Sequence, residues 1–164
     1  MEYRDALLNP KIVFRRTGDG FGAFAEVPIF VDEILVRWEG TVLQKTEFEL
    51  TSTEIKTHSI QIDETSYLVP FEISEADYFN HSCEPNIGLQ GPRTLVAMRP
   101  IAKNEPLCYD YAMSDSTSYD EFVCQCGSPQ CRKFIRATDW KLPELQKRYA
   151  AYFSPYLKKR LDII

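Results

Sequence analysis

Three cysteines within eight residues constrain this chain more than any other feature. They are Cys124, Cys126 and Cys131 in the segment FVCQCGSPQCRKF, where Gly127 and Pro129 provide tight bends that let the thiols converge. Zinc takes four ligands in a tetrahedron, and a structural site leaves no position open. A fourth ligand must therefore come from another part of the chain.

The remaining candidates for the fourth ligand are Cys83, Cys108, His58 and His81. Cys108 lies in an apolar run, where a free cysteine usually behaves as a small buried hydrophobic residue. Cys83 lies beside polar groups in YFNHSCEPN, and we favour it as the fourth ligand, which makes it unavailable as a nucleophile. The alternatives are free or redox-active cysteines and a Cys–His protease site, although no evident third group would orient the latter.

Length and composition fit one domain with one core. The chain has 164 residues, of which 44% are hydrophobic, enough for a single core. No apolar run approaches the roughly 18 residues that span a bilayer, and the first residues lack a signal-peptide pattern. We expect a soluble protein without a membrane partner, cytoplasmic in a bacterium or nuclear in a eukaryote.

Charge is divided unevenly along the chain. Residues 1–123 hold 10 Lys and Arg against 21 Asp and Glu, and residues 124–164 hold 9 against 3, so the formal charge of −5 combines a net −11 with a net +6. An acidic body attracts a basic partner, because its summed field concentrates cations; the alternative is a merely solvated surface. The basic tail fits a helix surface or a nucleic-acid patch, but its aromatic residues recur at helical spacing, so we do not expect nucleic acid as a partner.

Short β-like runs dominate the body of the chain. They are rich in β-branched and apolar residues and are bounded by polar or turn residues, as strands are. We expect strands at residues 12–14, 34–38, 59–62, 94–98 and 107–111, and a β-like run at 17–29 that glycines 18, 20 and 22 interrupt. Residues 46–56 are charged and fit either a helix or a loop.

Helical patterns appear at two places. Ser74 is a suitable N-cap for a helical turn that precedes the Asn-His-Ser-Cys loop. Near the end of the chain, apolar and aromatic residues recur at spacings of three and four, which predicts an amphipathic helix; they are Leu142, Leu145, Tyr149, Tyr152 and Tyr156. Ser154 and Pro155 are typical of a helix start, so we expect two short helices.

The glycines of GDGFG do not make a nucleotide-binding motif on their own. No helix pattern follows Gly18, Gly20 and Gly22, as the dinucleotide fingerprint requires, and no Lys-Ser/Thr pair completes a phosphate loop. Glycines allow another backbone or a ligand to approach closely at the start of a strand. An ordinary turn explains them equally well.

Four segments in this order resemble the SET-domain protein lysine methyltransferases with a C-terminal post-SET zinc motif. They are GDGFGAFA at 18–25, YFNHSCEPN at 78–86, PLCYDYA at 106–112 and CQCGSPQCR at 124–132. The resemblance implies a mostly β fold of small sheets around a pseudoknot, with short helices and C-terminal amphipathic helices. It divides the chain into a SET domain at 1–123, a post-SET zinc-binding segment at 124–136 and a helical extension at 137–164.

The resemblance also implies roles for particular residues. S-adenosylmethionine would be held by Gly20, Phe21, Gly22, Asn80, His81 and Phe134. Tyr111 would be the active-site tyrosine, and Tyr109 would limit how many methyl groups are added. Structural zinc would be bound by Cys83, Cys124, Cys126 and Cys131. One departure stands out, because Asp77 occupies a position where the family commonly has arginine.

The activity implied by the resemblance is S-adenosylmethionine-dependent methylation of a lysine. The substrate would be a basic protein or peptide, histone-like or ribosomal, and the product mainly mono- or dimethyl-lysine. The alternative is a catalytically inactive, zinc-stabilised module that binds basic peptides through its acidic body. The presence of Asn80, His81 and Tyr111 favours the enzyme.

Overall fold

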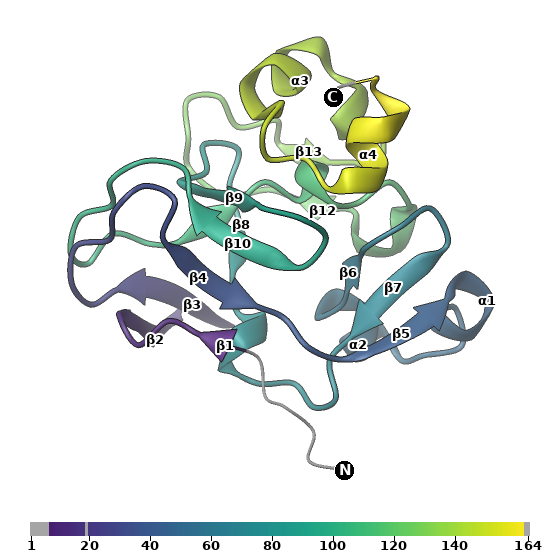
Figure 1. Ribbon diagram of the computed structural model, residues 1–164, viewed down its shortest axis with the longest axis horizontal. Coiled ribbons are helices and arrows are strands. Elements are labelled where there is room, and N and C mark those ends of the chain that lie inside the picture. The colour runs from purple at the N-terminus through teal and green to yellow at the C-terminus, as the bar shows by residue number, and fades with distance from the viewer. Residues whose placement is uncertain (1–6, 19, 163–164) are drawn as a thin grey trace.

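The computed structural model describes residues 7–18 and 20–162, and short strands dominate it (Figure 1). The strands are β1 (Leu7–Leu8), β2 (Ile12–Thr17), β3 (Gly20–Ala25), β4 (Ile34–Arg37), β5 (Thr41–Gln44), β6 (Ile60–Gln61), β7 (Ser66–Val69), β8 (Asn80–His81), β9 (Ile87–Leu89), β10 (Thr94–Ala97), β11 (Cys108–Tyr109), β12 (Phe122–Val123) and β13 (Phe134–Ile135). The α-helices are α1 (Lys45–Phe48), α2 (Thr53–Thr57), α3 (Pro143–Tyr149) and α4 (Pro155–Arg160). Single 3₁₀ turns are η1 (Glu75–Asp77), η2 (Tyr111–Met113), η3 (Ser118–Asp120) and η4 (Asp139–Lys141). Within the described ranges, no helix has both the length and the apolar character needed to cross a membrane.

The main core lies on a four-stranded antiparallel sheet with the order β1-β4-β10-β9. Every residue of β9 and β10 is buried. A strand buried in this way reads as a continuous apolar run rather than as an alternating one. Burial therefore explains why Thr94–Ala97 could be recognised in the sequence as a strand.

A smaller sheet, β5-β7-β6, carries its own apolar cluster. Phe48 at the end of α1 stacks on Tyr67 of β7 with ring centroids 3.9 Å apart. Tyr119 of η3 meets both rings edge-on. This cluster joins the first half of the chain to the segment that precedes the cysteines.

The parallel pair of β8 and β11 threads two distant segments together. Cys108 lies opposite Asn80, and Tyr109 lies opposite His81. Buried Asn86 extends the pairing, because its Oδ1 accepts a hydrogen bond from the Cys108 N–H and its Nδ2 donates to the Pro106 carbonyl. The Asn-His and Tyr-Asp-Tyr segments thus lie together, as a SET-type pseudoknot requires.

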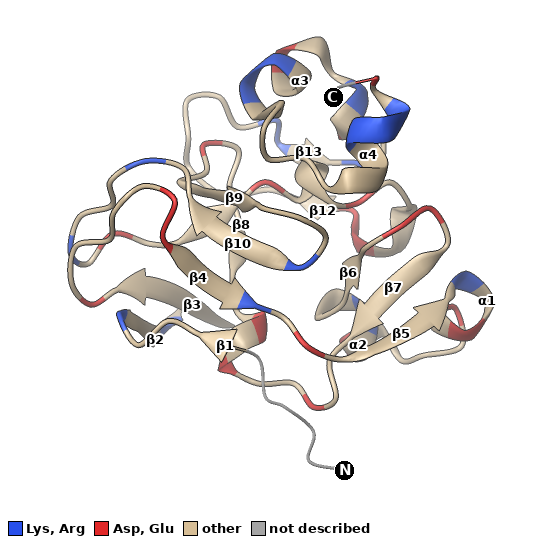
Figure 2. Ribbon diagram, viewed as in Figure 1, with Lys and Arg blue, Asp and Glu red and all other residues tan. Residues whose placement is uncertain are grey.

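The C-terminal helices α3 and α4 pack on the body beside β9 and β10 (Figure 1). Their buried face consists of Leu145, Tyr149, Tyr156 and Leu157. Figure 2 shows lysine and arginine on the outside of both helices. Tyr152, between the helices, lies directly over Gly88 of β9.

Most secondary-structure predictions are confirmed. The strands at 34–38, 59–62 and 94–98, the turn after Ser74 and the two C-terminal helices are present within one or two residues. The strand predicted at 12–14 continues to Thr17, and the β-like run at 17–29 contains the shorter strand β3. The charged segment 46–56 forms parts of α1 and α2 with a break between them. The predicted division of the chain after residues 123 and 136 stays a prediction.

Two details of the prediction are wrong. The strand expected at 107–111 ends at Tyr109, because Asp110 caps η2 by accepting a hydrogen bond from the Ala112 N–H. Tyr111 therefore begins a turn instead of continuing the strand. Ser154 does occupy the N-cap position of α4, but its hydroxyl makes no capping bond and is buried without a hydrogen-bond partner.

We predict that Gly88→Ala destabilises the protein. A Cβ atom at this position would lie 2.8 Å from the Cβ, Cγ and Cδ1 atoms of Tyr152, and overpacking of this kind costs about 1–3 kcal/mol. Chemical denaturation without ligand measures the loss. Gly20→Ala is the matched control, since a Cβ atom there meets nothing within 4 Å. A Tyr152→Ala background should remove most of the effect, and equal stability of Gly88→Ala and the unmodified protein would contradict this packing.

Candidate active site and zinc site

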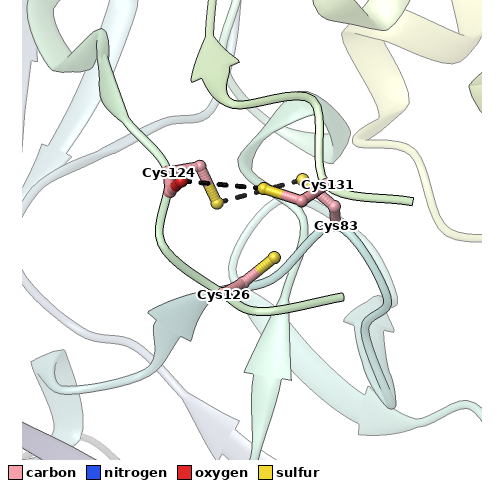
Figure 3. A group of neighbouring side chains, drawn as sticks. All are labelled: Cys83, Cys124, Cys126 and Cys131. Carbon is pink, nitrogen blue, oxygen red and sulfur yellow. Dashed lines mark hydrogen bonds between the residues drawn. The ribbon is translucent and has the colours of Figure 1, made fainter. Parts of the chain in front are cut away.

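The four predicted zinc ligands form one cluster. The sulfur atoms of Cys83, Cys124, Cys126 and Cys131 all lie within 4.8 Å of one another, and they point toward a common centre in Figure 3. Zinc–sulfur bonds of about 2.3 Å in a tetrahedron place sulfurs roughly 3.8 Å apart, and Cys83 and Cys124 are separated by 3.9 Å. The donor set and its geometry therefore fit zinc, and Cys108 lies outside the cluster.

Backbone groups also suit bound thiolates. The Arg132 N–H donates to the Cys83 sulfur and the Lys133 N–H to the Cys131 sulfur, each at 3.4 Å. Lys133 reaches this position with φ of 66°, in the left-handed region. Burial raises the pKa of the Cys83 thiol to about 11, so zinc binding must displace a proton there.

His81 connects the cysteine cluster to Tyr111. The Tyr111 N–H donates to His81 Nδ1 at 3.2 Å, and His81 Nε2 lies 3.4 Å from the Cys83 sulfur. Burial lowers the pKa of His81 to about 4, so the ring is neutral. Because Nδ1 accepts a bond, the proton lies on Nε2 and is directed at the sulfur, an arrangement that orients a metal ligand.

A groove of about 430 Å³ opens beside this cluster, a volume within the usual range for small-molecule sites. Its lining includes Tyr78, Asn80, His81, Tyr111, Phe122, Cys124, Gln125 and Cys126. Two zinc-cluster cysteines are thus part of its wall. The structure brings predicted residues Asn80, His81 and Tyr111 together in this groove.

The glycine loop reaches the groove through Asn80. Asn80 Nδ2 donates to the Phe21 carbonyl at 2.8 Å, and a Cβ atom on Gly22 would lie 3.1 Å from that nitrogen. The Phe21 ring packs on Tyr78 with centroids 5.4 Å apart. Gly22 therefore allows a close approach of β3 to β8, which gives the glycine a specific steric role.

A second cavity, which we call the channel, adjoins the groove. Its walls are aromatic and acidic, with Trp38, Phe79, Tyr109 and Tyr111 among the aromatic residues and Glu39, Asp77, Asp115 and Asp120 as the acids. Its free volume is about 30 Å³, room for only one or two waters. Five residues border both cavities: Thr57, His58, Asp77, Tyr111 and Asp120.

Tyr111 lies where the groove and the channel meet. Its hydroxyl donates to the Phe79 carbonyl at 3.3 Å, which leaves the oxygen lone pairs free to accept. Its ring lies 4.8 Å from that of Tyr109, centroid to centroid. Burial raises the pKa of both hydroxyls above the usual range, so both tyrosines are neutral.

The same dry surroundings shift the pKa values of two acids of the channel, Asp115 and Asp120. Burial raises the pKa of Asp115 to about 7 and that of Asp120 to about 6. The charge of Asp120 adds to the increase at Asp115, whereas His58 partly offsets the increase at Asp120. Both carboxyls therefore change their protonation near neutral pH.

Sequence reasoning and structure differ on some members of the site. Gly20, Phe21, Gly22 and Phe134 are not among the residues that line the groove; Phe134 lies on β13 opposite Val123, and its cofactor role stays a prediction. Sequence reasoning did not identify Phe122, Asp115 or Asp120, which lie in a polar stretch without a motif. It considered His58 only as a metal ligand, and His58 instead borders both cavities.

Comparison with known proteins identifies the fold. The family model described as SET domain matches residues 20–112, more than half of the chain. The chain belongs to the SET-domain family. The matched residues of this SET domain include both tyrosines, Asn80 and His81, while the cysteine segment 124–131 follows the match.

Similar proteins include much larger ones. The chain is 30% identical over 146 residues to histone-lysine N-methyltransferase ATX2 of Arabidopsis thaliana, covering 79% of this chain and 13% of that protein. It is 28% identical over 136 residues to human histone-lysine N-methyltransferase 2B, covering 75% and 5%. The chain thus spans only a small part of the length of these relatives.

A solved structure supports the fold. KRYPTONITE, crystallised with mCHH DNA, an H3(1-15) peptide and SAH, superposes with a TM-score of 0.59 at 22% identity. The match covers 77% of this chain and 30% of that one. Together with the small sheets around the β8–β11 pair, it confirms the predicted SET-domain fold.

We predict that the purified protein carries about one zinc ion per chain, bound by four thiolates. Structural zinc contributes folding free energy of order 10 kcal/mol in small sites. Cys124→Ser should therefore lose zinc and loosen the C-terminal segment, and it should also weaken cofactor binding because Cys124 lines the groove.

Metal analysis and thermal unfolding measure these effects. Cys108→Ser is the matched control and should retain its zinc, because Cys108 lies outside the cluster. Freshly purified, reduced protein without zinc, in which Cys83 is freely alkylated, would contradict the site.

Proposed function

We propose that this SET domain transfers a methyl group from S-adenosylmethionine to a lysine of a basic protein. The observation that carries this proposal is the meeting of the groove and the channel at Tyr111. A methyl donor in one cavity and an amine in the other would face each other there. Holding two reactants in such an arrangement is itself a large part of catalysis.

The groove fits S-adenosylmethionine by size and chemistry. Its volume suits a ligand of this class, and Tyr78 and Phe122 offer aromatic surfaces to an adenine ring. Asn80 retains its amide oxygen as an acceptor for the ligand's amino group, since its Nδ2 is used by Phe21. When bound, S-adenosylmethionine supplies an activated methyl group on a sulfonium.

The lining of the channel, rather than its free volume, suits a lysine side chain. Aromatic rings pack well along an aliphatic stem and attract an ammonium through their faces, and four carboxyl groups make the lining acidic. The acidic body favours encounter with a basic peptide. The H3 peptide in the KRYPTONITE structure supports a histone-like tail as the first substrate to test, with ribosomal proteins as the second.

Tyr111 would orient the substrate nitrogen. Its proton is committed to the Phe79 carbonyl, so its oxygen is an acceptor at the junction of the two cavities. An acceptor there can hold one N–H of the amine and so aim the nitrogen lone pair toward the groove. The residue acts by positioning and excludes water together with Tyr109 and Trp38.

Labelled S-adenosylmethionine tests the proposal directly. We would incubate the full chain with it and with core histones, ribosomal proteins and cell lysate, and then locate labelled lysines by mass spectrometry. Transfer to lysine supports the enzyme. Binding of basic peptides without transfer would instead support the inactive binding module.

We predict that Asn80→Ala weakens S-adenosylmethionine binding by one to two decades, since a hydrogen bond to a charged group contributes roughly 1.5–3 kcal/mol. Calorimetry measures the affinity. Asn9→Ala is a suitable control, because the Asn9 amide bonds Glu33 and the Ile34 carbonyl and does not line the groove. Equal affinities of Asn80→Ala and the unmodified protein would remove Asn80 from the cofactor site.

The two tyrosines should respond differently to loss of their hydroxyls. We expect mainly monomethyl-lysine, with some dimethyl-lysine, from the native enzyme, because the Tyr109 hydroxyl fills space that a methylated nitrogen would need. Tyr109→Phe should shift the product toward higher methylation, and Tyr111→Phe should lose most of kcat because its oxygen positions the amine in the transition state. Mass spectrometry of the product measures the number of methyl groups on the lysine. Abundant trimethyl-lysine from the native enzyme would show that Tyr109 does not limit that number.

A further inference from the structure

We propose that Asp115 accepts the proton that the substrate lysine must lose before methyl transfer. The inference rests on the proposed function and assigns a catalytic role within the same site. A lysine side chain has an ordinary pKa of about 10.4 and enters as an ammonium, which has no lone pair. The reaction therefore needs a proton acceptor as well as a methyl donor.

The structure holds the Asp115 carboxylate in the channel wall. Asp115 Oδ1 accepts hydrogen bonds from the Tyr119 hydroxyl and, at 3.4 Å, from the Gln61 N–H. The Asp115 N–H donates to the Tyr111 carbonyl at 2.9 Å, so its backbone is tied to the active-site turn. Asp115 lines the channel together with Tyr109 and Tyr111, which is the cavity proposed for the lysine.

The loop around Asp115 is fixed by a buried glutamine. Gln61 is fully buried, and its Oε1 accepts from the Ser116 N–H at 2.9 Å. Tyr67 adds a hydrogen bond to the Thr117 hydroxyl at 2.8 Å. A carboxylate held from several sides keeps a fixed direction, as a proton acceptor requires.

The groups that surround Asp115 leave its carboxylate free to accept a proton. Asp120 and tyrosines from five surrounding elements face it, namely Tyr67, Tyr109, Tyr111, Tyr119 and Tyr156. Of the nearby basic groups, His58 faces Asp120 and Arg160 bonds Ser116. Among the described residues, no lysine or arginine forms an ion pair with Asp115.

The dry channel favours transfer of the proton. With room for only one or two waters, neither an ammonium nor a carboxylate is well hydrated there, so burial lowers the pKa of the amine and raises that of the acid. The positive sulfonium in the groove would lower the amine pKa further. An ion pair of Asp115 and ammonium can then become a neutral acid and a neutral amine.

The reaction balances without another reagent. One N–H bond of the ammonium breaks, and the proton joins Asp115 as an O–H. The nitrogen lone pair then attacks the methyl carbon, an N–C bond forms, the C–S bond breaks and its electron pair stays on sulfur. The positive charge moves from sulfur to nitrogen, and Asp115 later returns its proton to solvent.

Steady-state kinetics over a pH series test the proposal on the full, zinc-containing chain. The probes are the H3(1-15) peptide and the same peptide with S-aminoethylcysteine, a more acidic amine, in place of lysine. We expect Asp115→Asn to lose roughly 100-fold in kcat, the scale of general-base catalysis, with a much smaller change in KM. Native kcat/KM, which reports the free enzyme, should fall as the pH drops below about 7, because Asp115 is then protonated and cannot accept a proton. Asp115→Asn should lack this acidic limb.

Further measurements distinguish a catalytic role of Asp115 from a structural one. The more acidic amine should recover part of the activity of Asp115→Asn, and Asp115→Glu should recover part with lysine. Asp32→Asn is the matched control, since Asp32 is exposed with φ of 64°, which asparagine tolerates. Thermal unfolding and S-adenosylmethionine affinity show whether Asp115→Asn is folded. If it is not folded, the acidic limb of the native pH profile and the activity of Asp115→Glu test the proposal instead.

Three outcomes would overturn the inference: an unchanged kcat in folded Asp115→Asn, a rise in KM alone, or the acidic limb persisting without the carboxylate. A rise in KM alone would mean that Asp115 only binds the ammonium. If the unmodified protein methylates neither peptide nor the histone and ribosomal pools, the proposed function itself fails. That failure is recognised before any variant is made.

Discussion

The buried ion pair between Asp110 and Arg132 holds the two halves of the site together. Asp110, which is fully buried, accepts two hydrogen bonds from the Arg132 guanidinium at 2.6 and 2.8 Å, and Arg132 also bonds Asp139. A buried charge that loses its partner destabilises a protein by about 3–5 kcal/mol. Because Asp110 lies between Tyr109 and Tyr111 and Arg132 follows Cys131, this contact fixes the turn at Tyr111 against the cysteine segment.

The cysteine segment lines the groove as well as fixing the C-terminal segment to the body. Strands β12 and β13 pair on either side of the metal loop, and Phe122 of β12 contacts the rings of His81 and Tyr111 edge-on, at centroid distances of 5.5 and 5.8 Å. Cys124 and Cys126 continue the same wall. The cysteine cluster, Phe122 and Tyr111 therefore lie together along one wall, an arrangement that suits chemistry that depends on positioning.

Features that depend on local patterns and motif spacing could be predicted from the sequence. Features that depend on contacts between distant segments could not. The choice of Cys83 over Cys108 followed from their neighbours, and the two C-terminal helices followed from spacing and Pro155. The strands Thr41–Gln44 and Ser66–Val69 were missed because their alternation is weak and they are defined by pairing with each other. The SDSTSYDE stretch reads as a solvated loop; only contacts with Gln61 and Tyr67, about fifty residues away, bring Asp115 into the channel.

The parallel pairing of β8 with β11 has a consequence for how the chain acquires its structure. The paired residues are separated by almost thirty positions, and two-residue strands contribute little by local order, so loop closure must precede any gain from the contact. Arg132 and three of the four cysteines lie later still in the chain. A nascent chain thus holds an unfinished core until residues 124–157 have been made, because residues as late as Tyr156 and Leu157 belong to the main core.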